Sequence, residues 1–291
     1  MTFVALLTKE LRLRLRRERT IWVVIIYLLV MSLLGFLFIT RTNSYNAYSL
    51  SSLGTGLYTL LAFLQLFLIM FITPAFTTTS INGEKERQTF DLLLCSRLSS
   101  FTLITGKLVA GLTNAFLLIL ASIPLFSLVF FFGGVGPEQV FYAALVDIVT
   151  AIVVGTFGLF CSTLLKRPPV STAIAYMFCV VWVVTPWVLA ALLNINSPLN
   201  GNSQPSYLFL GNPILAMMST LDFGGGISFG SFAFFKFNAS PWIAYIVVNL
   251  LLTLILILLS MWLVKPNPIG RLSRRMEKHP PKSKKVATIE I

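Results

Sequence analysis

Six long apolar stretches, separated by shorter polar segments, dominate the sequence. They cover about residues 21–40, 57–80, 108–132, 140–165, 170–193 and 242–264. A helix needs about 20 apolar residues to cross a bilayer, because the hydrocarbon layer is roughly 30 Å thick and each residue rises about 1.5 Å. Five of the stretches contain no Asp, Glu, Lys or Arg, and the fourth contains only Asp147. The pattern predicts an all-α polytopic membrane protein with six transmembrane helices.

Composition agrees with this prediction. The 291 residues are 56% hydrophobic and only 11% charged, whereas a soluble domain carries about 25% charged residues. A formal net charge of +12 is also typical of nucleic-acid-binding proteins, but few soluble ones are this apolar. We therefore expect no nucleic-acid partner, and we ask instead where the basic residues lie.

The basic residues predict the orientation of the spans. Twenty of the 22 Lys and Arg residues lie before the first span, in the second and fourth connections, or after the sixth span. The alternate side holds only Arg41 and Lys236. Positively charged short loops stay cytoplasmic. The sequence thus predicts a multi-pass protein of the cell membrane with both termini in the cytoplasm.

The six-span domain at 21–264 is flanked by two basic segments. In residues 1–20, Phe3, Leu7 and Leu11 share one helical face, which predicts an amphipathic interfacial helix. Alternatively, the basic residues of this segment are simply the positively charged flank that a first span carries on its cytoplasmic side. The tail at 265–291 is basic and proline-containing, and we expect it to contact anionic membrane lipids.

The longest connection, residues 194–240, lies on the predicted outer side. Within it, residues 213–221 begin with Pro213, which suits the first turn of a helix. This stretch is too short to span, so it predicts a re-entrant or interfacial helix before the sixth span. The alternative is an irregular external loop.

The second connection, residues 81–103, is the most charged part of the chain between spans and is predicted to be cytoplasmic. Thr89, Leu92 and Leu93 recur at helical spacing beside charged residues at 84–87, 91 and 97. They predict a short amphipathic helix under the membrane. Such a helix either binds a cytoplasmic partner or is a solvated connector with lipid-facing leucines.

This segment resembles the signature of ABC-2 type transporter permeases, the membrane subunits of a class of ATP-binding-cassette exporters. That signature runs from Glu-basic-Gly-Thr through a leucine cluster to a Ser and then a Gly-Lys pair. The matching residues are Glu86, Arg87, Thr89, Leu92, Leu93, Leu94, Ser99, Gly106 and Lys107. The chain departs from it at Gln88, where Gly is usual, and at Arg97, where Pro is common.

The resemblance implies a mechanism. Two permease subunits, identical or related, pack together, and each docks a coupling helix on a separate ABC ATPase subunit that binds ATP and Mg. This sequence has no GxxxxGK[ST] phosphate-binding loop, so we expect no enzyme activity in the chain itself and no cofactor bound to it. The residues expected to contact the ATPase are Glu84, Glu86, Arg87, Thr89, Leu92 and Leu93.

Asp147 is the one ionisable residue predicted inside a span, with Thr150 on the same face. Intramembrane carboxylates are costly and are therefore functional candidates. This polar site has three interpretations: helix packing, a substrate cavity or a proton site.

The sequence has a single histidine, His279, and no cluster of metal-ligand spacing. We therefore predict no catalytic triad and no metal site. The alternatives to a permease are a proton- or ion-coupled carrier, a channel, or a membrane sensor that uses the outer segment at 194–240.

Overall fold

The computed structural model describes residues 18–43, 50–86, 100–165, 167–192, 209–220, 232–234, 237–239 and 241–264. Its elements, in chain order, are α2 (Glu18–Asn43), α3 (Leu50–Thr77), α4 (Thr79–Glu86), α6 (Ser100–Phe132), α7 (Pro137–Leu164), α8 (Pro168–Leu192), α9 (Pro213–Thr220), β1 (Phe232–Phe234), β2 (Phe237–Ala239) and α10 (Pro241–Val264). Six helices in these ranges are long and apolar enough to cross a membrane. The predicted six-span, helical architecture is confirmed.

Four spans start and end within three residues of where the hydropathy pattern places them, whereas α3 begins at Leu50, seven residues before the predicted start, and α6 also begins early. The third span was predicted from residue 108, but α6 begins at Ser100. Lys107 is therefore a residue of the helix, not of the connection before it. The predicted helix in residues 1–20 and the tail at 265–291 lie outside the described residues, apart from the start of α2.

Proline marks the start of several helices. Pro137, Pro168, Pro213 and Pro241 are each the first residue of a helix. At that position the missing N–H costs nothing, because the first N–H groups of a helix have no partner inside it, and the fixed φ already suits a helix. These prolines therefore set where α7, α8, α9 and α10 begin.

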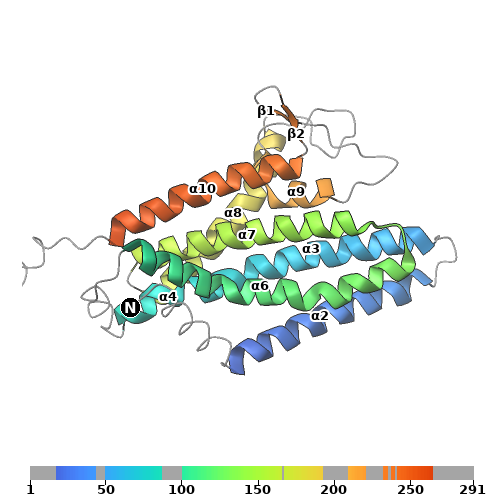
Figure 1. Ribbon diagram of the computed structural model, residues 1–291, viewed down its shortest axis with the longest axis horizontal. Coiled ribbons are helices and arrows are strands. Elements are labelled where there is room, and N and C mark those ends of the chain that lie inside the picture. The colour runs from blue at the N-terminus through green and yellow to red at the C-terminus, as the bar shows by residue number, and fades with distance from the viewer. Residues whose placement is uncertain are drawn as a thin grey trace, which may run out of the picture.

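The helix α7 lies at the centre of the bundle. In Figure 1 it runs between α10 and α3, with α6 beside α3 and α2 on the outer side. In an apolar stretch of 18 residues in α7, 67% is buried, whereas in the corresponding stretches of α2 and α8 the share is 17%. The centre of the fold is thus α7 with α3, α6 and α10 around it.

Glycine allows the central helices to approach closely. A Cβ added at Gly111 of α6 would lie 2.8 Å from Cγ2 of Thr77 in α3, and one at Gly155 of α7 would lie 2.6 Å from Cδ2 of Leu112. At Gly158 an added Cβ would meet the hydroxyl of Thr77. Small residues at helix crossings are the usual means of close packing in membranes, where apolar burial drives association less than it does in water.

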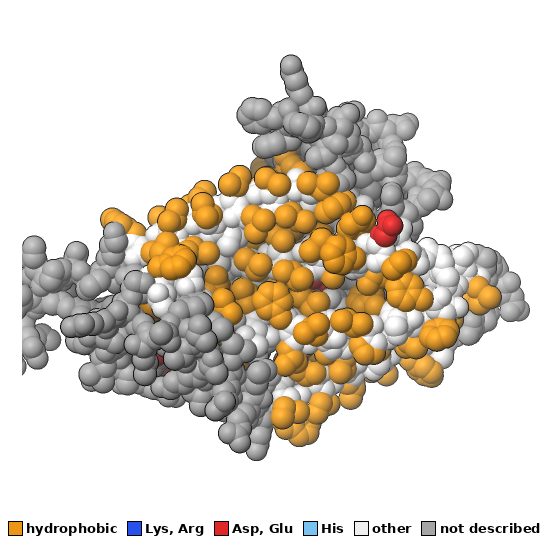
Figure 2. Space-filling model, in the orientation of Figure 1, with side chains coloured by type: hydrophobic (Ala, Val, Ile, Leu, Met, Phe, Trp, Pro, Cys, Tyr) orange, Lys and Arg blue, Asp and Glu red, His pale blue; other side chains and the backbone are white. Residues whose placement is uncertain are grey.

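The outside of the bundle is apolar. Large hydrophobic side chains of α2 and α8 are exposed, for example Phe36 at 63% and Met177 at 67%. Figure 2 shows hydrophobic side chains over most of the described part of one face. This is the surface expected of helices whose neighbours are lipid tails or another membrane subunit.

The chain before the sixth span forms a short helix, as Pro213 predicted. Asn212 begins α9: its side-chain oxygen accepts the N–H of Ile214 at 2.9 Å, which is a helix N-cap. Its amide nitrogen donates to the carbonyl of Val183 at 3.0 Å, one turn before Pro186 in α8. Asn212 thus fastens α9 to α8.

A small antiparallel hairpin follows α9. Phe232 of β1 pairs with Ala239 of β2, and Phe234 with Phe237. The hydropathy pattern predicted no strands in this connection, so the hairpin is an addition to the helical fold.

The turn between α6 and α7 generates a stability prediction. Gly134 has a φ of +85°, and a Cβ there would overlap the carbonyl oxygen of Ser51. We expect Gly134→Ala to lower the free energy of unfolding by about 2 kcal/mol, because an L side chain is strained at positive φ and also meets backbone. Gly136→Ala is the matched control, since nothing lies within 4 Å of a Cβ there. Thermal denaturation in detergent measures both, and equal melting temperatures for the two variants contradict the prediction.

Candidate functional site

One candidate site lies where α4, the start of α6 and the end of α7 meet. Lys107 of α6 is only 3% exposed. Its Nζ atom pairs with Oε1 of Glu84 at 2.6 Å and donates to the carbonyl of Ser80 at 3.1 Å. A buried ammonium needs such partners, because an uncompensated charge away from water is costly. The Glu84–Lys107 ion pair therefore joins α4 to α6 on the two sides of the segment 87–99.

The predicted contact residues divide between described and undescribed parts of the chain. Glu84 is half-buried in the ion pair, and Glu86 is exposed at the end of α4. The other four, Arg87, Thr89, Leu92 and Leu93, lie outside the described residues. The structure thus places Glu84 beside Lys107, the lysine of the Gly-Lys pair that ends the signature of the second connection.

A second candidate site is the predicted polar site inside the bundle. Asp147 is 1% exposed, and its Oδ2 atom accepts a hydrogen bond from Nε2 of Gln65 in α3 at 2.9 Å. Gln65 in turn accepts one from the hydroxyl of Tyr27 in α2 at 3.3 Å. The other carboxyl oxygen, Oδ1, has no hydrogen-bond partner within the described part of the chain. The Gln65 side chain therefore joins three helices, α2 through Tyr27 and α7 through Asp147.

Thr150 lies one turn further along α7 and contacts a different neighbour. Its hydroxyl donates to the carbonyl of Val146 at 2.7 Å and lies 2.8 Å from the hydroxyl of Tyr245 in α10. Asp147 and Thr150 thus share a helix but not a hydrogen-bond network, because one joins α3 and the other joins α10.

Sequence reasoning missed Gln65, Tyr27 and Tyr245, which complete the intramembrane site. The available signal was weak: they are uncharged polar groups in apolar spans, where each buried polar group needs a partner. Reasoning from charge found Asp147 but not its partners, since spacing along one helix does not reveal the facing residue of another.

The described residues contain no group of three or more His, Cys, Asp or Glu side chains placed to hold a metal ion. What the two sites offer chemically is hydrogen bonding and charge pairing between helices.

The intramembrane site generates a second prediction. We expect Gln65→Leu to destabilise the fold by about 2 kcal/mol, because it leaves Oδ2 of Asp147 buried without a donor. Asp147→Asn keeps an oxygen that accepts from Gln65 and is expected to stay close to the wild-type melting temperature. Thermal denaturation in detergent compares the two. If Asp147→Asn is as destabilising as Gln65→Leu, the carboxylate charge itself holds the helices together and the hydrogen-bond explanation is wrong.

Comparison with known proteins identifies the family of this chain. The family model for the ABC-2 type transporter matches residues 1–190. A search of curated proteins gives no match. The matched range includes α2, α3, α4, α6, α7 and nearly all of α8. Because the match covers well over half of the 291 residues, and the described ranges hold six helices of spanning length, this multi-pass membrane chain belongs to the ABC-2 type transporter family.

Proposed function

We propose that the chain is the permease subunit of an ABC exporter, coupled through residues 81–103 to a separate ATPase subunit. Membrane domains of this family are typically non-catalytic and paired with an ATPase. The observation that carries the proposal is the family match over residues 1–190, which includes the whole charged second connection. ATP and Mg belong to the partner, since the sequence lacks a phosphate-binding loop. Family membership favours this function over the carrier, channel and sensor alternatives.

The structure of the flanking helices supports the coupling role. The Glu84–Lys107 ion pair holds the end of α4 against the start of α6, so displacement of the segment between them acts on both helices. Glu86, at the exposed end of α4, is accessible to a partner. We propose that Arg87, Thr89, Leu92 and Leu93 complete the contact.

The charge distribution supports an orientation. Lys85, Lys107 and Arg167 lie at one end of the described bundle and Arg41 at the other. By the positive-inside rule, the end that carries α4 faces the cytoplasm. The segments before α2 and after α10 then lie on the cytoplasmic side, where an ATPase subunit meets residues 81–103.

The apolar faces of α2 and α8 support assembly with a second membrane subunit. Both helices are largely exposed, so one of these faces is free to pack against an identical or related permease, with lipid covering the other. The spans of the described chain carry few charges, which favours an amphiphile, peptide or lipid-like substrate over a small ion.

Disruption of the predicted contact tests the function. We expect Glu86→Ala combined with Leu92→Asp to reduce recovery of the ATPase subunit at least fivefold. The first substitution removes a charged contact, and the second places a carboxylate in the leucine cluster. The chain is tagged and purified from its native membranes, and the bound Walker-motif ATPase is quantified by mass spectrometry. The melting temperature is expected to stay unchanged.

Glu138→Ala is the control, because Glu138 is an exposed acidic residue at the start of α7, away from α4. If no ATPase subunit purifies with the unmodified chain, the proposed function is wrong. If the double variant retains the ATPase in full, the coupling assignment is wrong while the family membership stands.

A further inference from the structure

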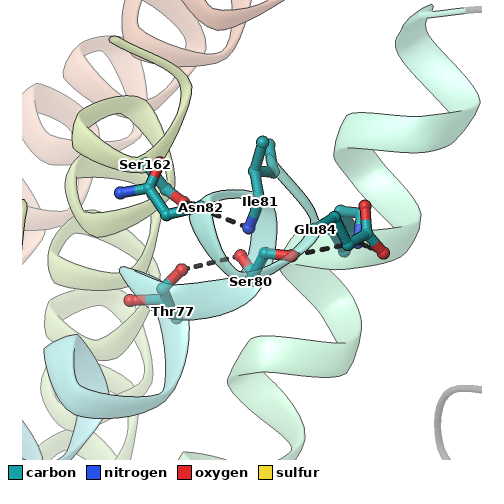
Figure 3. Close-up of polar contacts among 7 residues, drawn as sticks. Thr77, Ser80, Ile81, Asn82, Glu84 and Ser162 are labelled. Carbon is teal, nitrogen blue, oxygen red and sulfur yellow. Dashed lines mark hydrogen bonds and ion pairs between the residues drawn. The ribbon is translucent and has the colours of Figure 1, made fainter. Parts of the chain in front are cut away.

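The start of α4 is capped by a side chain from another helix. In an uninterrupted helix the N–H of Ile81 bonds the carbonyl of Thr77. Here the hydroxyl of Ser80 donates to that carbonyl at 2.7 Å. The N–H groups of Ile81 and Asn82 instead donate to Oγ of Ser162 in α7, at 3.1 and 3.0 Å (Figure 3). Ser162 thus provides a side-chain acceptor for N–H groups at the start of α4, where a helix has few partners of its own.

The end of α7 is capped by side chains of α4 in return. Nζ of Lys85 donates to the carbonyls of Ser162, at 3.2 Å, and Thr163. These belong to the last turn of α7, where carbonyls lack partners within the helix and where a positive charge is favourable. With its amide nitrogen turned toward α7, Asn82 also donates to the carbonyl of Leu165 at 2.6 Å.

Each helix therefore satisfies the end of the other, and we call these contacts the reciprocal cap. The link between α3 and α4 is different. It passes through Thr78, which belongs to neither helix, and Pro74 lies one turn earlier inside α3. The peptide chain and the Ser80 hydroxyl join α4 to α3, the Glu84–Lys107 ion pair joins it to α6, and the reciprocal cap fastens it to α7.

The helix α7 is suited to carry a displacement inward. It is the most buried of the six spans, and the same helix bears Asp147 and Thr150. Ser162 follows Asp147 by 15 residues, a distance of about 22 Å at about 1.5 Å per residue. Within α7 no proline interrupts the path from the cap to the intramembrane site.

We propose that α4 and α7 move as one body, so that α7, in addition to α6, receives the displacement imposed on residues 87–99 by the ATPase subunit. Ser162 and Lys85 are then positioning residues of the coupling. This inference rests on the proposed function, because it needs a partner that displaces α4. It goes further by naming the helix that responds and the contacts that hold it.

The first experiment measures the movement of α7 in the purified complex with its ATPase subunit. The native cysteines are replaced by alanine, and spin labels are attached at Arg41→Cys and Glu138→Cys. These are exposed positions on α2 and α7 at the ends opposite to α4. Unlabelled chain is kept in excess, so that one labelled copy is measured per complex. Addition of ATP with vanadate is expected to shift the distance between the labels.

Removal of the cap is expected to reduce that shift at least twofold. The variant combines Ser162→Ala with Lys85→Met, which deletes the hydroxyl and the ammonium that cross between the helices. Thr156→Ala is the matched control, because the Thr156 hydroxyl bonds carbonyls of its own helix, at Ile152 and Val153. Binding of the ATPase subunit and the melting temperature are recorded for every variant.

A second measurement does not require the variant without the reciprocal cap to fold. Gly83→Cys and Leu164→Cys place thiols on α4 and α7, where Gly83 has open space for a side chain and Leu164 is 55% exposed. A bifunctional maleimide joins them in the cysteine-free chain. If the two helices move together, the tether leaves ATP turnover of the complex within twofold of the untethered rate.

Three outcomes overturn the proposal: no shift in the otherwise unmodified chain, a full shift in the variant without the cap, or a tether that blocks ATP turnover. Failure of the proposed function is a separate result, since in that case no ATPase subunit purifies with the chain at all.

Discussion

A polar group inside a bilayer has no water to bond, so the protein itself must provide every partner. The arrangement of this bundle follows from that constraint. Where the chain breaks between α3 and α4, Ser162 of α7 bonds the start of α4, and at the start of α9 the side chain of Asn212 bonds a carbonyl of α8. Where a carboxyl group is buried, at Asp147, an amide from α3 meets it. These contacts determine which helices are neighbours more specifically than apolar packing does.

The central place of α7 has a second cause in its small side chains. Gly155 and Gly158 let α6 and α3 approach until their side chains contact the α7 backbone. Threonines, a serine and Asp147 also interrupt the apolar residues of α7. A helix of this composition is poorly suited to lipid and well suited to an interior lined by hydrogen-bond partners.

The sequence predicted the fold better than the sites. Six spans followed from apolar length alone, since few other structures require 20 consecutive apolar residues, and the start of α9 followed from Pro213. The extension of α6 back to Ser100 was missed, because polar residues there break the apolar run without breaking the helix. Lys107 was consequently treated as a flanking charge, and its ion pair with Glu84 was not foreseen.

Contacts between helices escaped prediction for a physical reason. Gln65 and Asp147 are 82 residues apart, and nothing in either local sequence specifies how α3 and α7 are rotated against each other. Family resemblance pointed to the second connection as the informative segment, and its central residues, 87–99, lie outside the described structure. The physical account of the site therefore rests on its two flanks, α4 and α6.

The connection between α6 and α7 also bears on how the protein enters the membrane. Only residues 133–136 separate Phe132 from Pro137, so the two helices leave the insertion machinery as a tethered hairpin. A carboxylate near the middle of a single inserting helix costs about 3 kcal/mol. Because α3 with Gln65 precedes α6 and α7 in the chain, the hydrogen-bond donor of Asp147 is synthesised before Asp147 itself. Chain order, with a four-residue turn, thus makes a partner for Asp147 available before the span that the bundle buries most deeply is complete.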